Sequence, residues 1–188
     1  MTEKEKMLLG KLYNANYDEK LRNERQNAKS LCYEFNNLNP SDESNKKNII
    51  KKLFGAIQDE FIIEQPFICD YGYNIEIGKN FYSNHNLTIL DCNKVKFGDN
   101  VFIGPNCSFY TDGHSLNAIL RNQWVEFAKL IEIGNNVCIG GSVTILPDVK
   151  IGDNVVIGTG SVVNKDIPSN TVAVGNPCKV IKNIEKWN

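Results

Sequence analysis

The sequence predicts a mainly β fold: a left-handed parallel β-helix of hexapeptide repeats with an N-terminal α-helical cap. Residues 133–168 form six consecutive hexads, each opened by an aliphatic residue, and Gly follows that residue in four of them. A strict period of six fits neither the 3.6-residue period of an amphipathic helix nor the two-residue period of an ordinary strand. The first sixty residues lack this repeat and space their apolar residues as helices do.

The N-terminal region predicts three short helices. Thr2 to Glu5 form a capping box, which begins the first helix. A second helical stretch runs from about Asp18 to Asn39, and Ser41 is expected to cap a third. The third carries one apolar stripe: Ile49, Ile50, Leu53, Phe54 and Ile57. We expect residues 1–58 to form a cap over the open end or side of the β-helix, where strand edges would otherwise stay unpaired.

The hexads extend toward the N-terminus and define the β-helix over residues 59–182, with a tail at 183–188. Three hexads make one coil, so the chain should wind once every eighteen residues. A two-residue slip at Val95-Lys96 separates two phases, and Ser83 is a weak member of the repeat. Gly and Asn suit the corners, where a positive φ or a tight backbone approach is required. The clear inward positions are 77, 89, 97, 103, 109, 133, 139, 145, 151, 157 and 163.

One segment interrupts the repeat. Ser115 and Arg121 occupy phases that should be aliphatic, which predicts a projecting loop over about 115–130. Long loops inside compact repeats are usually functional. His114 stands at the entrance of this loop, and the chain has only one other histidine, His85. Without other information, a single histidine in such a position is more often an ordinary surface residue than a catalytic one.

Composition limits the kinds of partner. The net charge is -1 and the pI is about 6.1, which gives no polyanion-binding signal and argues against nucleic acid. No apolar run approaches the length of a membrane span, and nothing resembles a signal peptide, so we expect a cytoplasmic protein. Six cysteines lie far apart in sequence and are expected to be free thiols. No close-spaced ligand set suggests a zinc cluster.

Several motifs together resemble the maltose and galactoside O-acetyltransferases. The resemblance covers nearly the whole chain and includes five segments besides the hexads: Tyr33 to Asn36, Asp70 to Ile75, Asn84-x-Asn86, Thr111 to His114, and Gly175 to Ile181. It implies acetyl-CoA-dependent transfer to a hydroxyl of a sugar such as maltose, glucose or a galactoside. It also implies a homotrimer with an active site between each pair of subunits, and no metal requirement.

The same resemblance implies roles for individual residues. His114 matches the general base and Asn84 the asparagine of the catalytic cleft. The acceptor-binding positions are Asp70, Asn84, Asp91 and Cys92, with one N-terminal residue at Asn16 or beside it, where Tyr17 and Asp18 are the alternatives. The coenzyme A positions are Gly141, Thr159, Asn164, Lys165, Lys179 and Lys182. No cysteine or serine has a base beside it in sequence, so we expect direct transfer rather than an acyl-enzyme.

Alternatives remain open at this stage. Cys92, Cys138 and Ser115 depart from residues usual in the family, which leaves the acceptor undecided. An amino sugar, an antibiotic or serine is a possible acceptor. A metal hydratase like the γ-class carbonic anhydrases would need three histidines, whereas this chain has two. A non-catalytic scaffold would leave the loop, His114 and Asn84 unexplained.

Overall fold

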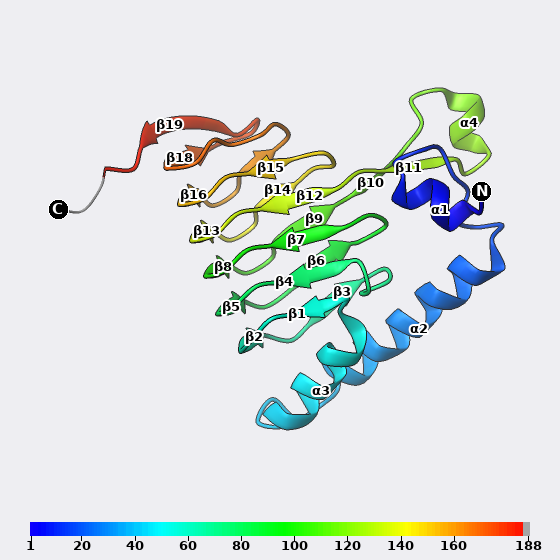
Figure 1. The fold of residues 1–188 in the computed structure, drawn as a ribbon, viewed down its shortest axis with the longest axis horizontal. Helices are drawn as coiled ribbons and strands as arrows, with labels where there is room; N and C mark the ends of the chain where they lie inside the picture. Colours follow the sequence, from blue (N-terminus) through cyan, green and yellow to red (C-terminus); the bar gives the residue numbers. More distant parts are fainter. Residues whose placement is uncertain (186–188) are drawn as a thin grey trace.

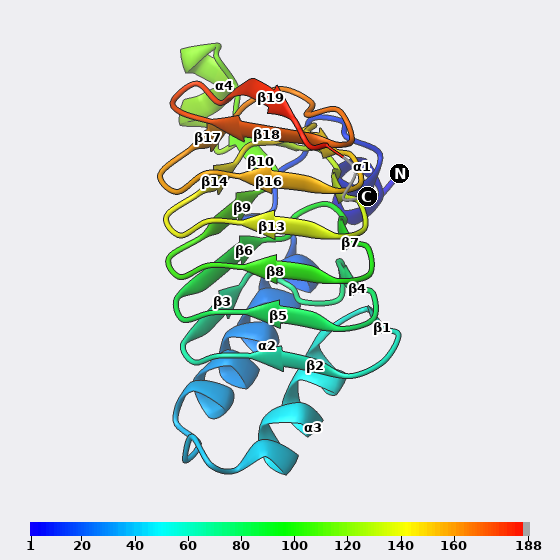
Figure 2. The same cartoon turned by 90° about the vertical axis from the view of Figure 1, so that its left-hand side faces the viewer.

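A computed structural model describes residues 1–185 and shows a triangular prism of parallel strands wound coil upon coil (Figures 1 and 2). Each coil contributes one short strand to each of three faces. Parallel pairing lets side chains of equivalent positions stack directly above one another. The first face contains β1 (Ala56–Ile57), β4 (Ile75–Ile77), β7 (Val95–Phe97), β12 (Ile131–Ile133) and β15 (Lys150–Ile151).

The other two faces complete the triangle. The second face contains β2 (Phe61–Ile63), β5 (Phe81–Ser83), β8 (Val101–Ile103), β13 (Val137–Ile139), β16 (Val155–Ile157), β18 (Thr171–Val174) and β19 (Lys179–Asn183). The third face contains β3 (Phe67–Cys69), β6 (Leu87–Leu90), β9 (Ser108–Tyr110), β14 (Thr144–Ile145) and β17 (Val162–Val163). At the C-terminal end β19 folds back antiparallel to β18 and covers the edge of the second face.

The predicted inward residues form the core. All eleven are at most 5% exposed, and they belong to one continuous hydrophobic cluster that runs the length of the prism. Ser83, the weak member of the repeat, is also fully buried. The prediction of a parallel β-helix with these side chains inside is therefore confirmed.

The predicted coil length is correct only for part of the prism. Ile133 pairs with Ile151, eighteen residues later, but Ile77 pairs with Phe97, twenty residues later. The two extra residues of the longer coils lie at the corner between the third and first faces, in segments 70–74 and 91–94. That corner is thus the place where the chain departs from the hexad repeat.

Asparagine and glycine serve the corners in different ways. Asn80, Asn100 and Asn136 adopt φ between 53° and 57° and form a ladder of side-chain hydrogen bonds of 2.9 and 3.1 Å. Gly98 has no positive φ. A Cβ there would lie 2.8 Å from the carbonyl of Gly134 in the next coil, so glycine permits the close stacking of coils.

The three predicted helices form the cap. They are α1 (Glu3–Leu8), α2 (Glu19–Asn36) and α3 (Glu43–Leu53). The capping box of Thr2 is present, but the N-cap of α3 is Asp42, not Ser41, because the Asp42 carboxylate accepts the Asn45 N–H at 3.2 Å. Helices α2 and α3 close the open end of the first coil, and their buried faces join the main core (Figure 2).

The segment that interrupts the repeat projects from the prism as an arm (Figure 1). It is a β-hairpin with a helical tip, made of β10 (Asp112–His114), α4 (Ala118–Asn122) and β11 (Glu126–Ala128). The prediction of a projection was right, and the structure adds that it is ordered by antiparallel pairing. Its tip exposes apolar side chains, including Leu116 at 98% and Ile119 at 70%.

The cysteines match the prediction of free thiols. All six cysteines are free thiols, although Cys32 and Cys69 place their sulfur atoms 3.7 Å apart. Among residues 1–185, no helix combines the length and the hydropathy needed to cross a bilayer.

The inward stack generates a test of the fold. Ile151 is 1% exposed, and Ile151→Asp would place an unpaired carboxylate inside the prism. We expect a loss of more than about 4 kcal/mol in the free energy of unfolding, or no folded protein. Lys150→Asp, one residue earlier and pointing outward, should cost less than about 1 kcal/mol. Thermal melting followed by circular dichroism checks both, and an unchanged melting temperature for Ile151→Asp would contradict the inward assignment.

Candidate active site

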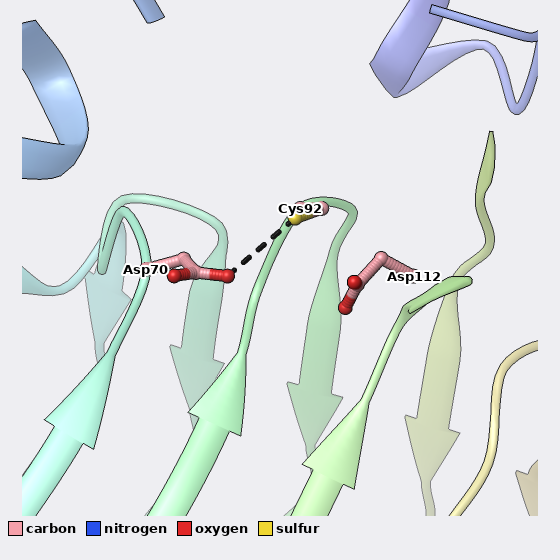
Figure 3. Close-up of side chains that lie close together, drawn as sticks. All are labelled: Asp70, Cys92 and Asp112. Atoms are coloured by element: carbon pink, nitrogen blue, oxygen red, sulfur yellow. Dashed lines mark hydrogen bonds between the residues drawn. The ribbon is translucent and has the colours of Figure 1, made fainter. Parts of the chain in front are cut away.

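The corner between the third and first faces gathers polar side chains from three successive coils. Asp70 follows β3, Cys92 lies in the turn after β6, and Asp112 begins β10. The Cys92 thiol donates to Asp70 Oδ2 at 3.6 Å (Figure 3). One potential ligand atom from each of the three residues lies within 4.8 Å of the other two. We call this corner, together with His114, the His114 corner.

His114 is the last residue of β10 and lies at the base of the arm. It is exposed, and its register partner across the hairpin is Glu126. Asp112, only two residues earlier, belongs to the polar cluster. The fold thus places the one histidine of the arm beside a cluster of carboxylates, with its imidazole open to an incoming molecule.

Asp91 has a different role from the predicted acceptor contact. It is fully buried, and its carboxylate accepts the backbone N–H groups of Asp70 at 3.1 Å, Tyr71 at 2.8 Å and Asn74 at 3.3 Å. Burial raises its pKa to about 7, against the opposing effect of those donors. Because its oxygens hold the 70–74 turn and none faces solvent, Asp91 positions Asp70 instead of binding acceptor.

The N-terminal cap walls this corner. A second, smaller hydrophobic cluster joins the cap to it: Met7, Tyr13, Ala15, Leu21, Tyr71, Cys92 and Ala128. The Tyr13 backbone exchanges two 3.0 Å hydrogen bonds with Glu126 in the arm, and Asn14 Nδ2 donates to the Gln123 carbonyl at 2.7 Å. The cap therefore does more than cover a coil end, since it also fixes the arm against the polar cluster.

Asn16 lies on the same side of the corner as Asp70. Its Oδ1 accepts a 3.1 Å hydrogen bond from Arg25 of α2. Burial raises the pKa of Asp70, while the hydrogen bond from Cys92 and the charge of Arg25 oppose that effect. Asp18 is the N-cap of α2, so its carboxylate is occupied by the Leu21 N–H.

The polar cluster contains two half-buried carboxyl groups, those of Asp70 and Asp112. Burial, reinforced by the charge of Asp70, raises the pKa of Asp112 to about 6. Burial also raises the pKa of the Cys92 thiol well above its usual range. Three buried oxygen atoms at this corner have no hydrogen-bond partner within residues 1–185: Tyr13 Oη, Tyr71 Oη and Asp112 Oδ1. The corner can therefore accept further hydrogen bonds or positive charge.

Asn84 lies at a different corner, between the second and third faces, which we call the Asn84 corner. Gly141 and Thr159 stack in later coils of the same corner. The third face separates it from the His114 corner, and the four residues of β6 alone span roughly 13 Å. Asn84 and His114, the predicted catalytic pair, are thus not brought together within one chain.

The remaining predicted coenzyme A residues are exposed but dispersed. Asn164 and Lys165 follow β17, at a later coil of the edge that carries His114. Lys179 and Lys182 lie on β19, where they pair with Val174 and Val172. One chain by itself therefore offers no single cleft that contains all of these groups.

Sequence reasoning missed several residues of the site. Asp112, Tyr13, Tyr71 and Glu126 contribute to it, and none was a candidate. A usable signal existed for Asp112, because it follows Cys92 by 20 residues, the spacing that places residues level with one another in these coils. Tyr13 gave no such signal, since it reaches the corner only through tertiary packing.

Comparisons with known proteins agree with this architecture. The family described as the maltose acetyltransferase hexapeptide capping motif matches residues 6–58, and the bacterial transferase hexapeptide, six repeats, matches residues 131–165. A Saccharomyces cerevisiae protein named as a candidate acetyltransferase, YJL218W, is 54% identical over 180 residues, which cover 96% of this chain and 92% of that protein.

Solved structures show the same relationship. A maltose O-acetyltransferase from Clostridium difficile 630 is 52% identical, with a TM-score of 0.97 and 99% of both chains covered. A galactoside acetyltransferase in complex with coenzyme A is 45% identical, with a TM-score of 0.95, and the match covers 98% of this chain and 92% of that one. The predicted left-handed hexapeptide-repeat β-helix is thereby confirmed. The chain belongs to the maltose and galactoside O-acetyltransferase family and is an acetyltransferase.

Proposed function

We propose that this protein transfers the acetyl group of acetyl-CoA to a hydroxyl of a sugar, in a crevice formed by two subunits of a trimer. The observation that carries the proposal is the position of His114, an exposed imidazole beside a walled cluster of carboxylates. The coenzyme A and acetyl-CoA complexes of similar proteins support the donor. Carboxylate oxygens that accept hydrogen bonds from hydroxyl groups support a saccharide acceptor.

The chemistry follows from the two predicted catalytic residues. The imidazole of His114 takes the proton of the sugar hydroxyl as its oxygen attacks the thioester carbonyl carbon. The C–O bond forms, the C–S bond breaks, and coenzyme A leaves as a thiol after receiving a proton. The tetrahedral oxyanion needs donors. Asn84 Oδ1 accepts the His85 N–H at 2.7 Å, which orients the Asn84 side-chain amide as that donor.

The acceptor would occupy the His114 corner. Asp70 and Asn16 offer polar atoms there, Cys92 lies between Asp70 and Asp112, and Asp91 fixes the turn that presents Asp70. The cap and arm form the walls, which limits the size of the acceptor. This arrangement suits a neutral molecule with several hydroxyl groups.

The coenzyme would lie along the later coils. Gly141 and Thr159 border the Asn84 corner. Gly160, which follows Thr159 and adopts φ +75°, faces open space: a Cβ built on it would have no neighbouring atom within 4 Å. Asn164 and Lys165 could contact the pantetheine arm. Lys179 and Lys182 would act as point charges for the phosphates.

In the proposed trimer, the His114 corner of one subunit meets the Asn84 corner of its neighbour. The second face carries an outward apolar row in which Ile62 is 51%, Phe102 43% and Val156 37% exposed. A contiguous exposed row of this kind is typical of a surface that packs on another subunit. A neighbour packed there can place its His114 corner against this chain's Asn84 corner. Cyclic symmetry would then repeat the same contact at each of the three subunit pairs.

Removal of the imidazole tests the general base. With acetyl-CoA and a panel of mono- and disaccharides, the wild type should release coenzyme A thiol, measured by a colorimetric thiol reagent. We expect His114→Ala and His114→Gln to lower turnover at least about 100-fold, the lower end for loss of a general base. Coenzyme A binding by calorimetry should stay nearly unchanged in both. Near-normal turnover would remove His114 from the mechanism.

Subunit mixing tests the shared site. His114→Ala and Asn84→Ala should each be inactive alone. Trimers assembled from equal amounts of the two variants should regain roughly one quarter of wild-type activity, because half of the His114 corners and half of the Asn84 corners remain intact and they combine at random. Each variant refolded alone is the control. If mixing restores nothing while the mixed trimers form, the two residues do not come from different subunits.

A further inference from the structure

The His114 corner brings together one thiol and two carboxylates in a geometry close to that of a metal site. The Cys92 sulfur, one Asp70 oxygen and one Asp112 oxygen lie within 4.8 Å of one another, and the Cys92–Asp70 pair is 3.6 Å apart (Figure 3). An ion held at about 2.3 Å from sulfur and about 2.0–2.2 Å from oxygen separates such ligand atoms by roughly 3.5 Å. The Cys92–Asp70 pair already has this separation, and Asp112 lies within 4.8 Å of both.

A second observation comes from two tyrosines beside this cluster. The Tyr13 and Tyr71 side chains are 2% and 3% exposed, yet neither hydroxyl makes a hydrogen bond of normal geometry within residues 1–185, and the Tyr13 hydroxyl faces Cys92 and Glu126. Both rings pack with Cys92 in the same small cluster. A buried hydroxyl without a partner is costly, so these oxygens indicate a site that is incomplete without a ligand. The unpartnered Asp112 Oδ1 at the same corner points to the same conclusion.

The chemistry of the ligand atoms selects the class of ion. Sulfur disfavours Mg²⁺ and Ca²⁺, whereas a thiolate with two carboxylates suits a borderline divalent transition ion such as Zn²⁺ or Co²⁺. Coordination deprotonates a thiol outright, so the raised pKa of Cys92 weakens binding at neutral pH but does not prevent it. Arg25 lies on the Asp70 side, but its guanidinium is engaged by the Ala15 carbonyl and Asn16.

We propose that the His114 corner binds one Zn²⁺-class ion through Asp70, Cys92 and Asp112, and that this ion competes with the acceptor. Asp70 and Asp112 are also the carboxylates available to hydrogen-bond an acceptor hydroxyl, so an ion held by them would occupy acceptor space. The metal-binding part of this proposal does not depend on the proposed function. The competition rests, in addition, on the proposed function.

Cobalt provides a direct readout of the thiolate ligand. The full-length protein, freed of metal by a chelator, is titrated with Co²⁺, and the near-ultraviolet thiolate-to-cobalt charge-transfer band is recorded. We expect one Co²⁺ per chain, displaced by one Zn²⁺. Cys92→Ser should abolish the band, and Asp70→Asn or Asp112→Asn should weaken binding at least tenfold.

Matched variants separate this site from the other thiols. Cys138→Ser removes the exposed thiol, and Cys32→Ser removes half of the Cys32–Cys69 pair, so both should keep the band. A wild-type protein without the band, or a band that persists in Cys92→Ser, would overturn the site. If Cys92→Ser fails to fold, the two aspartate variants decide in its place.

Kinetics test the competition separately. Zn²⁺ should raise the KM for the sugar and leave the KM for acetyl-CoA unchanged, and Asp112→Asn should lose this sensitivity. Zn²⁺ that binds but leaves acetyl transfer unaffected would overturn the competition and leave the metal site standing. Inactivity toward every sugar would instead contradict the proposed function, while the cobalt spectrum would still decide the metal site.

Discussion

The stacking of inward side chains from coil to coil is the interaction on which the rest of this structure depends. Each strand has only two to five residues, too few to be stable alone, so every coil needs the one before it. The helical cap supplies the first partner, since α2 and α3 bury their apolar faces on the opening coil. The turns of Asn and Gly then keep the coils close enough for the stack to continue.

This constraint also explains where the site can form. Inward positions cannot vary without loss of the core, whereas extra residues at a corner project outward and leave the stack intact. The corner between the third and first faces uses this freedom three times: in segments 70–74 and 91–94, and in the arm that follows β9. Asp70, Cys92 and Asp112 accordingly gather at one edge, at the level of the coils that the cap and arm enclose.

The prism separates the two residues that we propose for catalysis. Asn84 lies at one edge of the third face, and His114 lies at the other. A rigid face cannot bend to bring them together, so a second copy of the chain offers the simplest way to complete the site. The same corner that would receive the acceptor has the chemistry to receive a metal ion, because a thiol and two carboxylates serve both as hydrogen-bonding groups and as ligands.

The sequence by itself determined the β-helix, the cap and the inward residues, because these follow from a local period that needs no knowledge of distant contacts. It also singled out His114 as a candidate, since one histidine stood where the period failed and in a segment that resembles the acetyltransferase family. It could not give the role of Asp91 or the closeness of Asp70 to Cys92, which arise only when the corner turns pack on one another. Nor could it place Tyr13 beside Cys92, because only the packing of the cap on the arm joins residues so far apart in the chain.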